Sequence, residues 1–91
     1  MTLAETLAER EARYGSFGDH ALIAQSLQSV MRGNEIIKTG WDGLAPDMQQ
    51  ALTVIADKIA RILNGDPTYI DNWHDIQGYA RLVEQRLEKQ S

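Results

Sequence analysis

A sharp turn at residues 64–67, Asn-Gly-Asp-Pro, separates two amphipathic stretches in the second half of the chain. Asparagine and glycine favour the end of a helix, and proline cannot continue one. Apolar residues recur at helical spacing on both sides of the turn: Met48, Leu52, Ile55, Ile59 and Ile62 before it, and Tyr69, Trp73, Ile76, Ala80, Val83 and Leu87 after it. We therefore predict an antiparallel helical hairpin over residues 46–89, which favours an all-α fold.

The ends of the two hairpin helices carry further signals. Pro46 suits the first turn of the earlier helix, because the amide hydrogen that proline lacks would have no partner there in any case. Gly65 is expected to end that helix in a left-handed conformation. Asp66 can cap the later helix with Pro67 in its first turn, whereas a later start would use Asp71 as the cap.

Several hairpin residues receive a structural interpretation from their helical positions. Trp73 lies within the apolar stripe of its helix and is predicted to pack in the core. Asp57 and Arg61 form an i,i+4 pair that is expected to point toward water, and His74 is also expected to be solvated. Gly78 lies inside a helix, where glycine is unfavourable, and therefore indicates the close approach of another helix or a ligand.

Two more helices are predicted before the hairpin. Thr2 and Glu5 have the spacing of a capping box, and the first helix is expected to run to about Arg13. Ser16 can cap a second helix that begins at Phe17. The second helix has an apolar stripe that consists of His20, Ile23, Ala24, Leu27, Val30 and Met31.

The four helices predict a single all-α domain over residues 1–91, a small four-helix bundle-like fold with the antiparallel hairpin at its C-terminal end. The segment from Glu35 to Ala45 lacks a helical period and is predicted to be a loop with at most one helical turn. Because a chain of 91 residues can bury only a small core, we expect a homo-oligomer, with a dimer favoured.

Composition narrows the environment and the partners of the chain. The absence of cysteine fits a reducing compartment, and a cytoplasmic location is expected. The formal net charge of -4 and the absence of a basic segment argue against binding to nucleic acid. No segment approaches the roughly 20 apolar residues of a membrane span, so no membrane association is expected.

Four polar residues of the last predicted helix, Asn72, Asp75, Tyr79 and Arg86, share one edge of its apolar stripe when residues are placed about 100° apart. Lys58 lies at the edge of the stripe on the preceding helix and can reach its neighbour. A carboxylate at such a half-buried edge can hold a divalent cation or a substrate hydroxyl. A pair formed by Lys58 and Asp75 would serve equally well as a structural salt bridge.

Known catalytic motifs do not extend this candidate site. His20 lies on an apolar stripe, where a lone histidine is more often a hydrogen-bonded core residue than a ligand. The chain contains no HExxH, GxSxG, GxxxxGK[ST] or GxGxxG motif. Hydrolase triads, P-loop NTPases and dinucleotide-binding folds are therefore disfavoured.

Three segments carry a resemblance to known proteins: ARYGSFGDHA near the N-terminus, ALTVIADKIARILNGDP before the turn and YIDNWHDIQGYARL after it. Together they resemble small phage and prophage proteins of uncharacterised function over nearly the whole chain. The hairpin is also similar to remote variants of the MazG-type all-α nucleotide pyrophosphohydrolases. In that family, paired acidic motifs on adjacent helices hold magnesium.

The MazG resemblance implies roles for individual residues of this chain. Asn72 and Asp75 would occupy the two acidic places of the second motif, with Asp71 one step before them. Asp75 and Asp71 are then the candidate ligands of Mg²⁺. Lys58, Asn72 and Tyr79 are the candidate substrate-binding residues, and the implied substrate is a nucleoside triphosphate.

The earlier hairpin helix departs from the MazG pattern. Asp57, Lys58 and Arg61 stand where the first acidic pair is expected, so half of the magnesium ligands are missing unless the fold brings Glu9, Asp19 or Asp71 close. Lys58 and Arg61 could instead contact phosphate groups directly. Two hypotheses follow: a MazG-like protein that binds or hydrolyses a nucleotide, and a non-catalytic helical interaction module that forms a homo-oligomer.

Overall fold

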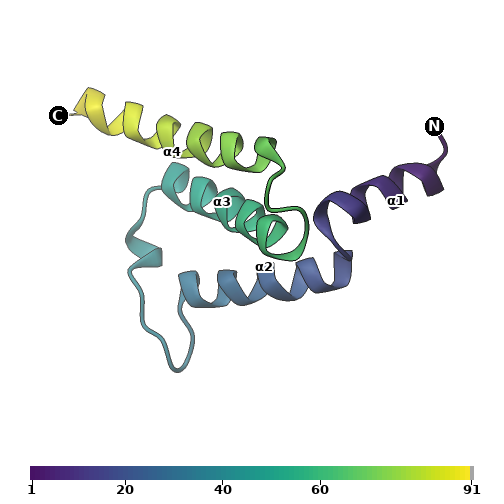
Figure 1. The fold of residues 1–91 in the computed structure, drawn as a ribbon. Coiled ribbons are helices and arrows are strands. Elements are labelled where there is room, and N and C mark those ends of the chain that lie inside the picture. The colour runs from purple at the N-terminus through teal and green to yellow at the C-terminus, as the bar shows by residue number, and fades with distance from the viewer. Residues whose placement is uncertain (91) are drawn as a thin grey trace.

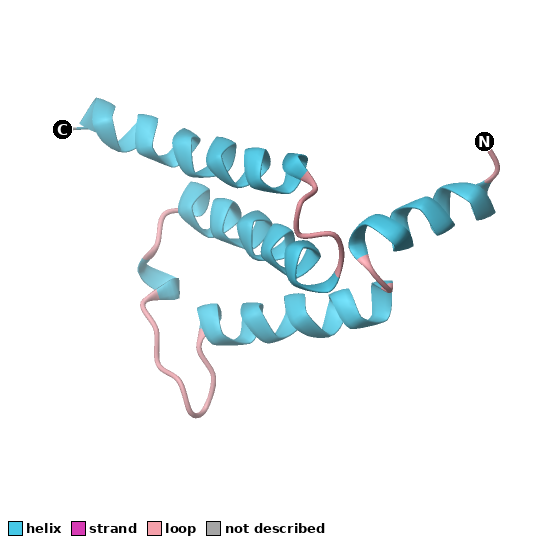
Figure 2. Cartoon of the chain, in the orientation of Figure 1, coloured by secondary structure: helices cyan, strands magenta, loops and turns pink. Residues whose placement is uncertain are grey.

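The computed structural model describes residues 1–90, and in that range it contains four α-helices and no strand (Figures 1 and 2). α1 spans Leu3–Tyr14, α2 spans Phe17–Arg32, α3 spans Pro46–Asn64 and α4 spans Ile70–Gln90. A short 3-10 helix, η1 (Trp41–Gly43), lies in the loop before α3. The predicted all-α fold is confirmed, and so is the short helical turn in the loop.

The first two helices begin where their caps predict. The hydroxyl of Thr2 accepts a hydrogen bond from the amide of Glu5, and the hydroxyl of Ser16 accepts one from the amide of Asp19. Each contact satisfies a backbone donor that the helix itself leaves unpaired. These starting points were predictable because a cap depends on residues that are neighbours in the sequence.

The turn between α3 and α4 differs from its prediction in two respects. Gly65 follows α3 with a φ of -126°, so the expected left-handed cap is wrong. α4 begins at Ile70, later than a start capped by Asp66 and earlier than one capped by Asp71. The physical reason is that the Asp66 carboxylate accepts hydrogen bonds from the amide and hydroxyl of Thr68, which closes a separate turn before the helix.

Gly15 and Gly65 lie where the ends of α1 and α3 come into close backbone contact. A Cβ atom on Gly65 would lie 2.3 Å from the carbonyl oxygen of Arg13. A Cβ atom on Gly15, which has a φ of +77°, would lie 2.1 Å from the carbonyl oxygen of Asn64. Since no side chain fits at such distances, glycine is required at both positions by close approach. We call this contact the glycine junction.

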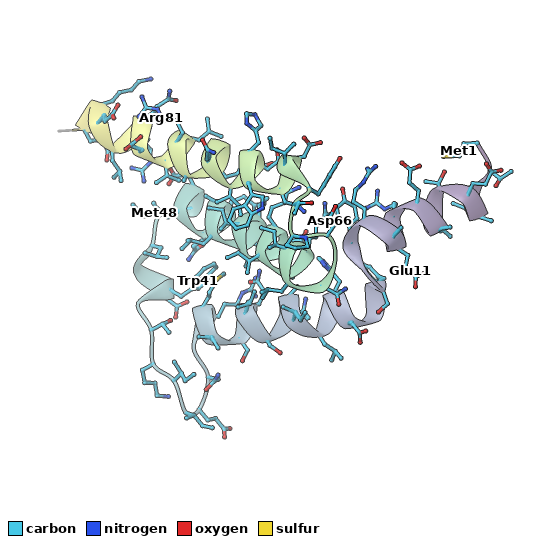
Figure 3. The ribbon with its side chains drawn as sticks, viewed as in Figure 1. Met1, Glu11, Trp41, Met48, Asp66 and Arg81 are labelled. Carbon is cyan, nitrogen blue, oxygen red and sulfur yellow. The ribbon has the colours of Figure 1, made fainter. Side chains whose placement is uncertain are left out.

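Hydrogen bonds lock the glycine junction. The side-chain amide of Asn64 donates to the carbonyl oxygens of Tyr14, at 3.0 Å, and Ser16, at 2.9 Å. The backbone amide of Asp66 donates to the carbonyl oxygen of Arg13 at 2.8 Å, and Figure 3 shows Asp66 close to the end of α1. The junction therefore holds the C-terminal end of α1 against the turn that joins α3 to α4.

The helices α2, α3 and α4 lie side by side with α3 in the middle, whereas α1 projects away from them (Figure 1). α3 packs against both of its neighbours, and no comparable packing joins α2 to α4. His20 of α2 contacts Asp57 of α3, and Lys58 of α3 contacts Asp75 of α4. The three helices thus form an open layer, and both broad faces of this layer remain uncovered.

Alanines occupy the lines along which these helices approach one another. The buried apolar residues of the described chain are Ala24, Ala51, Ala56 and Ala60. Residues spaced about 100° apart place Ala60 on the α2 side of α3 and Ala51 on the opposite, α4 side. Small side chains on both flanks let the central helix lie close to its two neighbours.

The larger apolar residues that were predicted to form the core lie partly exposed on one face of the layer. Leu52 and Ile59 of α3 are 39% and 37% exposed. Placing residues about 100° apart shows that α2 and α4 each turn an apolar edge to the same side. We call this surface the apolar face, and it consists of Ile23, Val30, Leu52, Ile59, Ile76 and Leu87.

Trp73 is a further correction to the predicted core. Its side chain is half exposed, because its indole N–H donates a hydrogen bond to the carbonyl oxygen of Pro67 at 2.8 Å. This bond holds the ring over the turn before α4. Gly78 is also not a packing contact, since nothing lies within 4 Å of the position that its Cβ would occupy.

The open layer leaves more surface in water than is usual for a chain of this size. Its accessible surface is 6490 Å², whereas a folded protein of the same mass exposes about 5300 Å². The radius of gyration is 15.4 Å, compared with about 12 Å for a compact domain of equal length. The projecting α1 accounts for part of this excess, and the uncovered faces of the layer account for the rest.

Candidate functional site

The face opposite the apolar face carries the polar contacts between helices, and we call it the polar face. Its side chains come from all three helices of the layer, namely His20, Asp47, Asp57, Lys58, Arg61, Asp75 and Arg86. Most of these side chains are partly buried, and each is paired with another of them.

The predicted contact between Lys58 and Asp75 is present. The Lys58 ammonium lies 2.9 Å from the Asp75 carboxylate, and the two side chains are 15% and 40% exposed. The hydrogen bond from Lys58 is the main cause that lowers the pKa of Asp75 below its ordinary value of 3.8, and nearby positive charges act in the same direction. This pair joins α3 to α4 and also presents one charged group of each sign near the surface.

The other predicted site residues are distributed differently. Tyr79 is 37% exposed and lines a shallow hollow of about 340 Å³ together with Asp75. Asn72 does not lie at a reachable edge, because it is 1% exposed and buried where α4 meets α3. Asp71 has a different partner, because its carboxylate accepts a hydrogen bond from the hydroxyl of Tyr69. Lys58 thus contacts Asp75, and Asp75 shares the hollow with Tyr79, whereas Asn72 and Asp71 have other surroundings.

The carboxylates are not arranged to share a divalent cation. Among residues 1–90 there is no group of three or more histidine, aspartate or glutamate side chains that could hold a metal ion. Mg²⁺ requires near-octahedral oxygen ligands. Asp75 is bound to Lys58, and Asp71 is bound to Tyr69, so the two candidate ligands do not fit the ion.

A second polar cluster was not predicted. The imidazole Nε2 of His20 lies 2.8 Å from one oxygen of the Asp57 carboxylate, and the Arg61 guanidinium lies 3.2 Å from the other. His20 is 8% exposed, so its interpretation as a hydrogen-bonded core residue is confirmed. The predicted i,i+4 pair of Asp57 and Arg61 is present, but the two side chains are only partly exposed, at 39% and 23%, because Asp57 also binds His20. A histidine within an apolar stripe requires a polar partner, and this signal could have directed attention to Asp57.

A third pair fastens the open end of the hairpin. The guanidinium of Arg86 donates to both oxygens of the Asp47 carboxylate, with an Nη2 to Oδ1 distance of 2.9 Å and a second bond from Nε. The hydrogen bond from Arg86 is the main cause that lowers the pKa of Asp47 and also raises the pKa of Arg86 itself. Asp47 was expected only to favour the start of its helix, so this second role was missed.

Arginines and tyrosines interleave where α1 meets the hairpin. The guanidinium carbon of Arg13 lies 4.5 Å from the ring centre of Tyr69, and that of Arg61 lies 4.7 Å from the ring centre of Tyr14. The two rings meet edge to face at 6.0 Å. Arg10 lies 5.6 Å from the ring centre of Tyr14 on the α1 side. Several cation–π contacts therefore surround the glycine junction.

The fold and its contacts define a small all-α domain with an apolar face and an ion-paired polar face. The family model described as Domain of unknown function (DUF6378) matches residues 2–87, and the chain belongs to this family. No curated protein and no solved structure matches the chain. Neither the family description nor the other comparisons link it to phage proteins or to MazG.

Over residues 1–90, no helix combines the length and the apolar character that crossing a bilayer demands. The exposed apolar side chains of this molecule are spread over several helices.

Proposed function

We propose that this chain is a self-associating helical module, in which the apolar faces of two copies pack against each other. The observation that carries this proposal is the exposure of the apolar stripes, because side chains such as Leu52 and Ile59 would normally be covered. A second layer of three helices placed on the first would bury both stripes at once. The product would be a two-layer homodimer with a continuous apolar core.

The surface area supports a second copy as the occupant of the apolar face. A stable interface removes roughly 800 Å² from each partner. The chain exposes about 1200 Å² more than a compact protein of its mass, and the uncovered faces of the layer contribute to this excess together with the projecting α1. The ion pairs between helices lie on the opposite face of the layer. A face of this kind is self-complementary when two copies meet across a twofold axis.

Sedimentation analysis of paired substitutions tests this proposal. Ile59→Glu places a charge in the middle of the apolar face, and we expect it to weaken association at least about 100-fold, because the charge would be buried without a partner. Gln50→Glu adds the same charge to an exposed position of the same helix and should leave association unchanged. A wild-type chain that stays monomeric at high micromolar concentration would refute the proposal.

A second candidate function is nucleotide binding at the polar face, as the resemblance to MazG-type proteins implies. The observation that favours it is the largely buried Lys58 ammonium beside Asp75, with Tyr79 lining the adjoining hollow. Lys58 would neutralise a phosphate group, and Tyr79 would contact the sugar or base. Because Asp75 and Asp71 do not fit Mg²⁺, this candidate involves binding without a metal-dependent hydrolysis. An origin among phage or prophage proteins is part of the same proposal and rests on sequence resemblance.

Thermal unfolding in the presence of a panel of nucleoside triphosphates, with and without magnesium, tests the second candidate. We expect at least one nucleotide to raise the unfolding midpoint of the wild-type chain. Lys58→Met should abolish this shift, whereas Lys38→Met, in the exposed loop before α3, should retain it. Release of pyrophosphate would show that the protein is catalytic, and the absence of any shift would exclude this candidate.

A further inference from the structure

A pocket of about 250 Å³ lies between α1 and α2, beside the end of α3. It is distinct from the hollow beside Tyr79 and shares no residue with the apolar face. The side chains that carry its chemistry are Arg10, Glu11, Tyr14, Phe17, His20 and Arg61. Two guanidinium groups, a buried imidazole and two aromatic rings thus meet in one small cavity of an acidic protein.

The two arginines of the pocket are held by one tyrosine ring. Arg61 approaches Tyr14 from α3, and Arg10 approaches the same ring from within α1. Arg61 also binds Asp57, with its Nε atom 3.2 Å from the carboxylate. Within residues 1–90, no ion pair joins Arg10 to a carboxylate. The pocket therefore contains the Arg10 guanidinium, whose N–H groups have no ion-pair partner among residues 1–90.

His20 supplies an independent sign that a ligand belongs here. Its side chain is 10% exposed, and its Nε2 atom is bound to Asp57. The other ring nitrogen, Nδ1, is buried and has no hydrogen-bond partner. A buried nitrogen without a partner is unfavourable, and native proteins usually satisfy such a group. The ring is held in place by Phe17, which stacks on it with the ring centres 6.1 Å apart.

We propose that this pocket binds a small phosphate ester. Arg10 and Arg61 donate hydrogen bonds to the phosphate oxygens. Because Nε2–H of His20 donates to Asp57, the other ring nitrogen, Nδ1, accepts a hydrogen bond from a hydroxyl group of the ester. Glu11 lines the same pocket and accepts a hydrogen bond from a hydroxyl or amino group of the ester. The exposed ring of Phe17 gives a flat group on the ligand a surface to stack on. The site is independent of self-association, because it lies away from the apolar face.

Titration of the full chain, followed by amide NMR shifts, tests the site with three probes: inorganic phosphate, a sugar phosphate and a nucleoside monophosphate. We expect saturable shifts at the amides of residues 10–20 with at least one probe. Tighter binding of either ester than of inorganic phosphate would identify the source of the phosphate group. Tighter binding of the nucleoside monophosphate would assign the flat group to Phe17.

Matched arginine variants decide whether the pocket is responsible. Arg10→Gln removes a charge from an exposed helix position and should weaken binding about tenfold or more, because a charge-assisted contact is lost. Arg81→Gln removes the same charge from the outer side of α4 and should leave binding unchanged. Equal weakening by both variants, or the absence of saturable shifts with all three probes, would overturn the proposal.

Discussion

The apolar face and the polar face of the layer are built from the same three helices. The polar side chains mostly have partners, whereas the apolar side chains are partly exposed. On the polar face, almost every charged group has a partner within the chain, as in the contacts of Lys58 with Asp75 and of His20 with Asp57. On the apolar face, Leu52 and Ile59 are more than a third exposed. The difference shows that specific polar contacts and alanine packing orient these helices, while the hydrophobic surface that usually closes a core remains available.

Gly65→Ala is expected to have the largest effect on stability. It should also show whether the polar face and the apolar face depend on each other. The new Cβ atom would overlap the backbone of Arg13 and Tyr14, which forces α1 away from the glycine junction. We expect the free energy of unfolding to fall by about 3 kcal/mol, the upper part of the usual range for one substitution. Urea unfolding measures this loss, and hydrogen exchange should show faster exchange at the Asp66 amide.

The same variant distinguishes the faces by what it leaves intact. The phosphate pocket needs α1 and should be lost in Gly65→Ala, whereas self-association needs only α2, α3 and α4 and should persist. Gly43→Ala is a suitable control, since nothing lies within 4 Å of the added atom. Loss of both functions together would show that the two faces depend on one another.

Asp57→Ala is the next largest change, and it acts on the polar face and on the adjoining pocket but not on the apolar face. It leaves the buried Nε2 of His20 without its partner and removes the carboxylate that binds Arg61. An unsatisfied buried group of this kind costs about 1–3 kcal/mol, which urea unfolding would detect. Asp42→Ala, an exposed aspartate in η1, is the matched control and should change stability little. An equal effect of both variants would argue that the His20 contact contributes nothing.

The helices could be predicted from the sequence, but the state of their surfaces could not. Caps such as Thr2 and Ser16 act within one turn, so they are visible in neighbouring residues. The helical period identifies a stripe that contains Leu52 and Ile59, yet it does not say which element covers that stripe. The alanines of α3 faced its neighbours instead, and the stripe was left open.

The candidate site was predicted in part for a related reason. Angular placement brings Lys58 and Asp75 together correctly, because both lie at the edges of adjoining helices. The same placement puts Asn72 at a reachable edge, whereas the rotation of α4 against α3 buries it. The contact between His20 and Asp57 joins residues that are 37 positions apart, so only the packing of α2 on α3 reveals it.

Acid should weaken the polar face through Asp47 and Asp75, with a smaller effect. Their partners Arg86 and Lys58 hold the pKa of each carboxylate below its ordinary value of 3.8. A group with a lowered pKa in the folded state stabilises the fold above pH 3.8 and loses this contribution as the pH falls toward the folded value. Thermal unfolding between pH 5 and pH 2 should therefore show a falling midpoint.

Carboxamide variants assign this acid sensitivity to its source. In Asp47→Asn the contribution is already absent at neutral pH, so the midpoint should start lower and fall less steeply below pH 4. Asp42→Asn, which lacks an ion pair within residues 1–90, should follow the wild-type curve. Parallel curves for the wild type and Asp47→Asn would show that the contact with Arg86 does not contribute to stability.

Gly78→Ala should have the smallest effect, and its sign sharpens the comparison of covered and open surfaces. The backbone of Gly78 is not left-handed. Apart from its own helix backbone, no atom lies within 4 Å of the position that a Cβ would occupy. Alanine is favoured over glycine inside a helix by about 0.5–1 kcal/mol, so the isolated chain should become more stable in urea unfolding. If a second copy packed on this side of α4 rather than on the apolar face, the added methyl group would obstruct it. A gain in stability with unchanged association would therefore exclude the outer side of α4 as the interface, and a gain with weakened association would place the interface there.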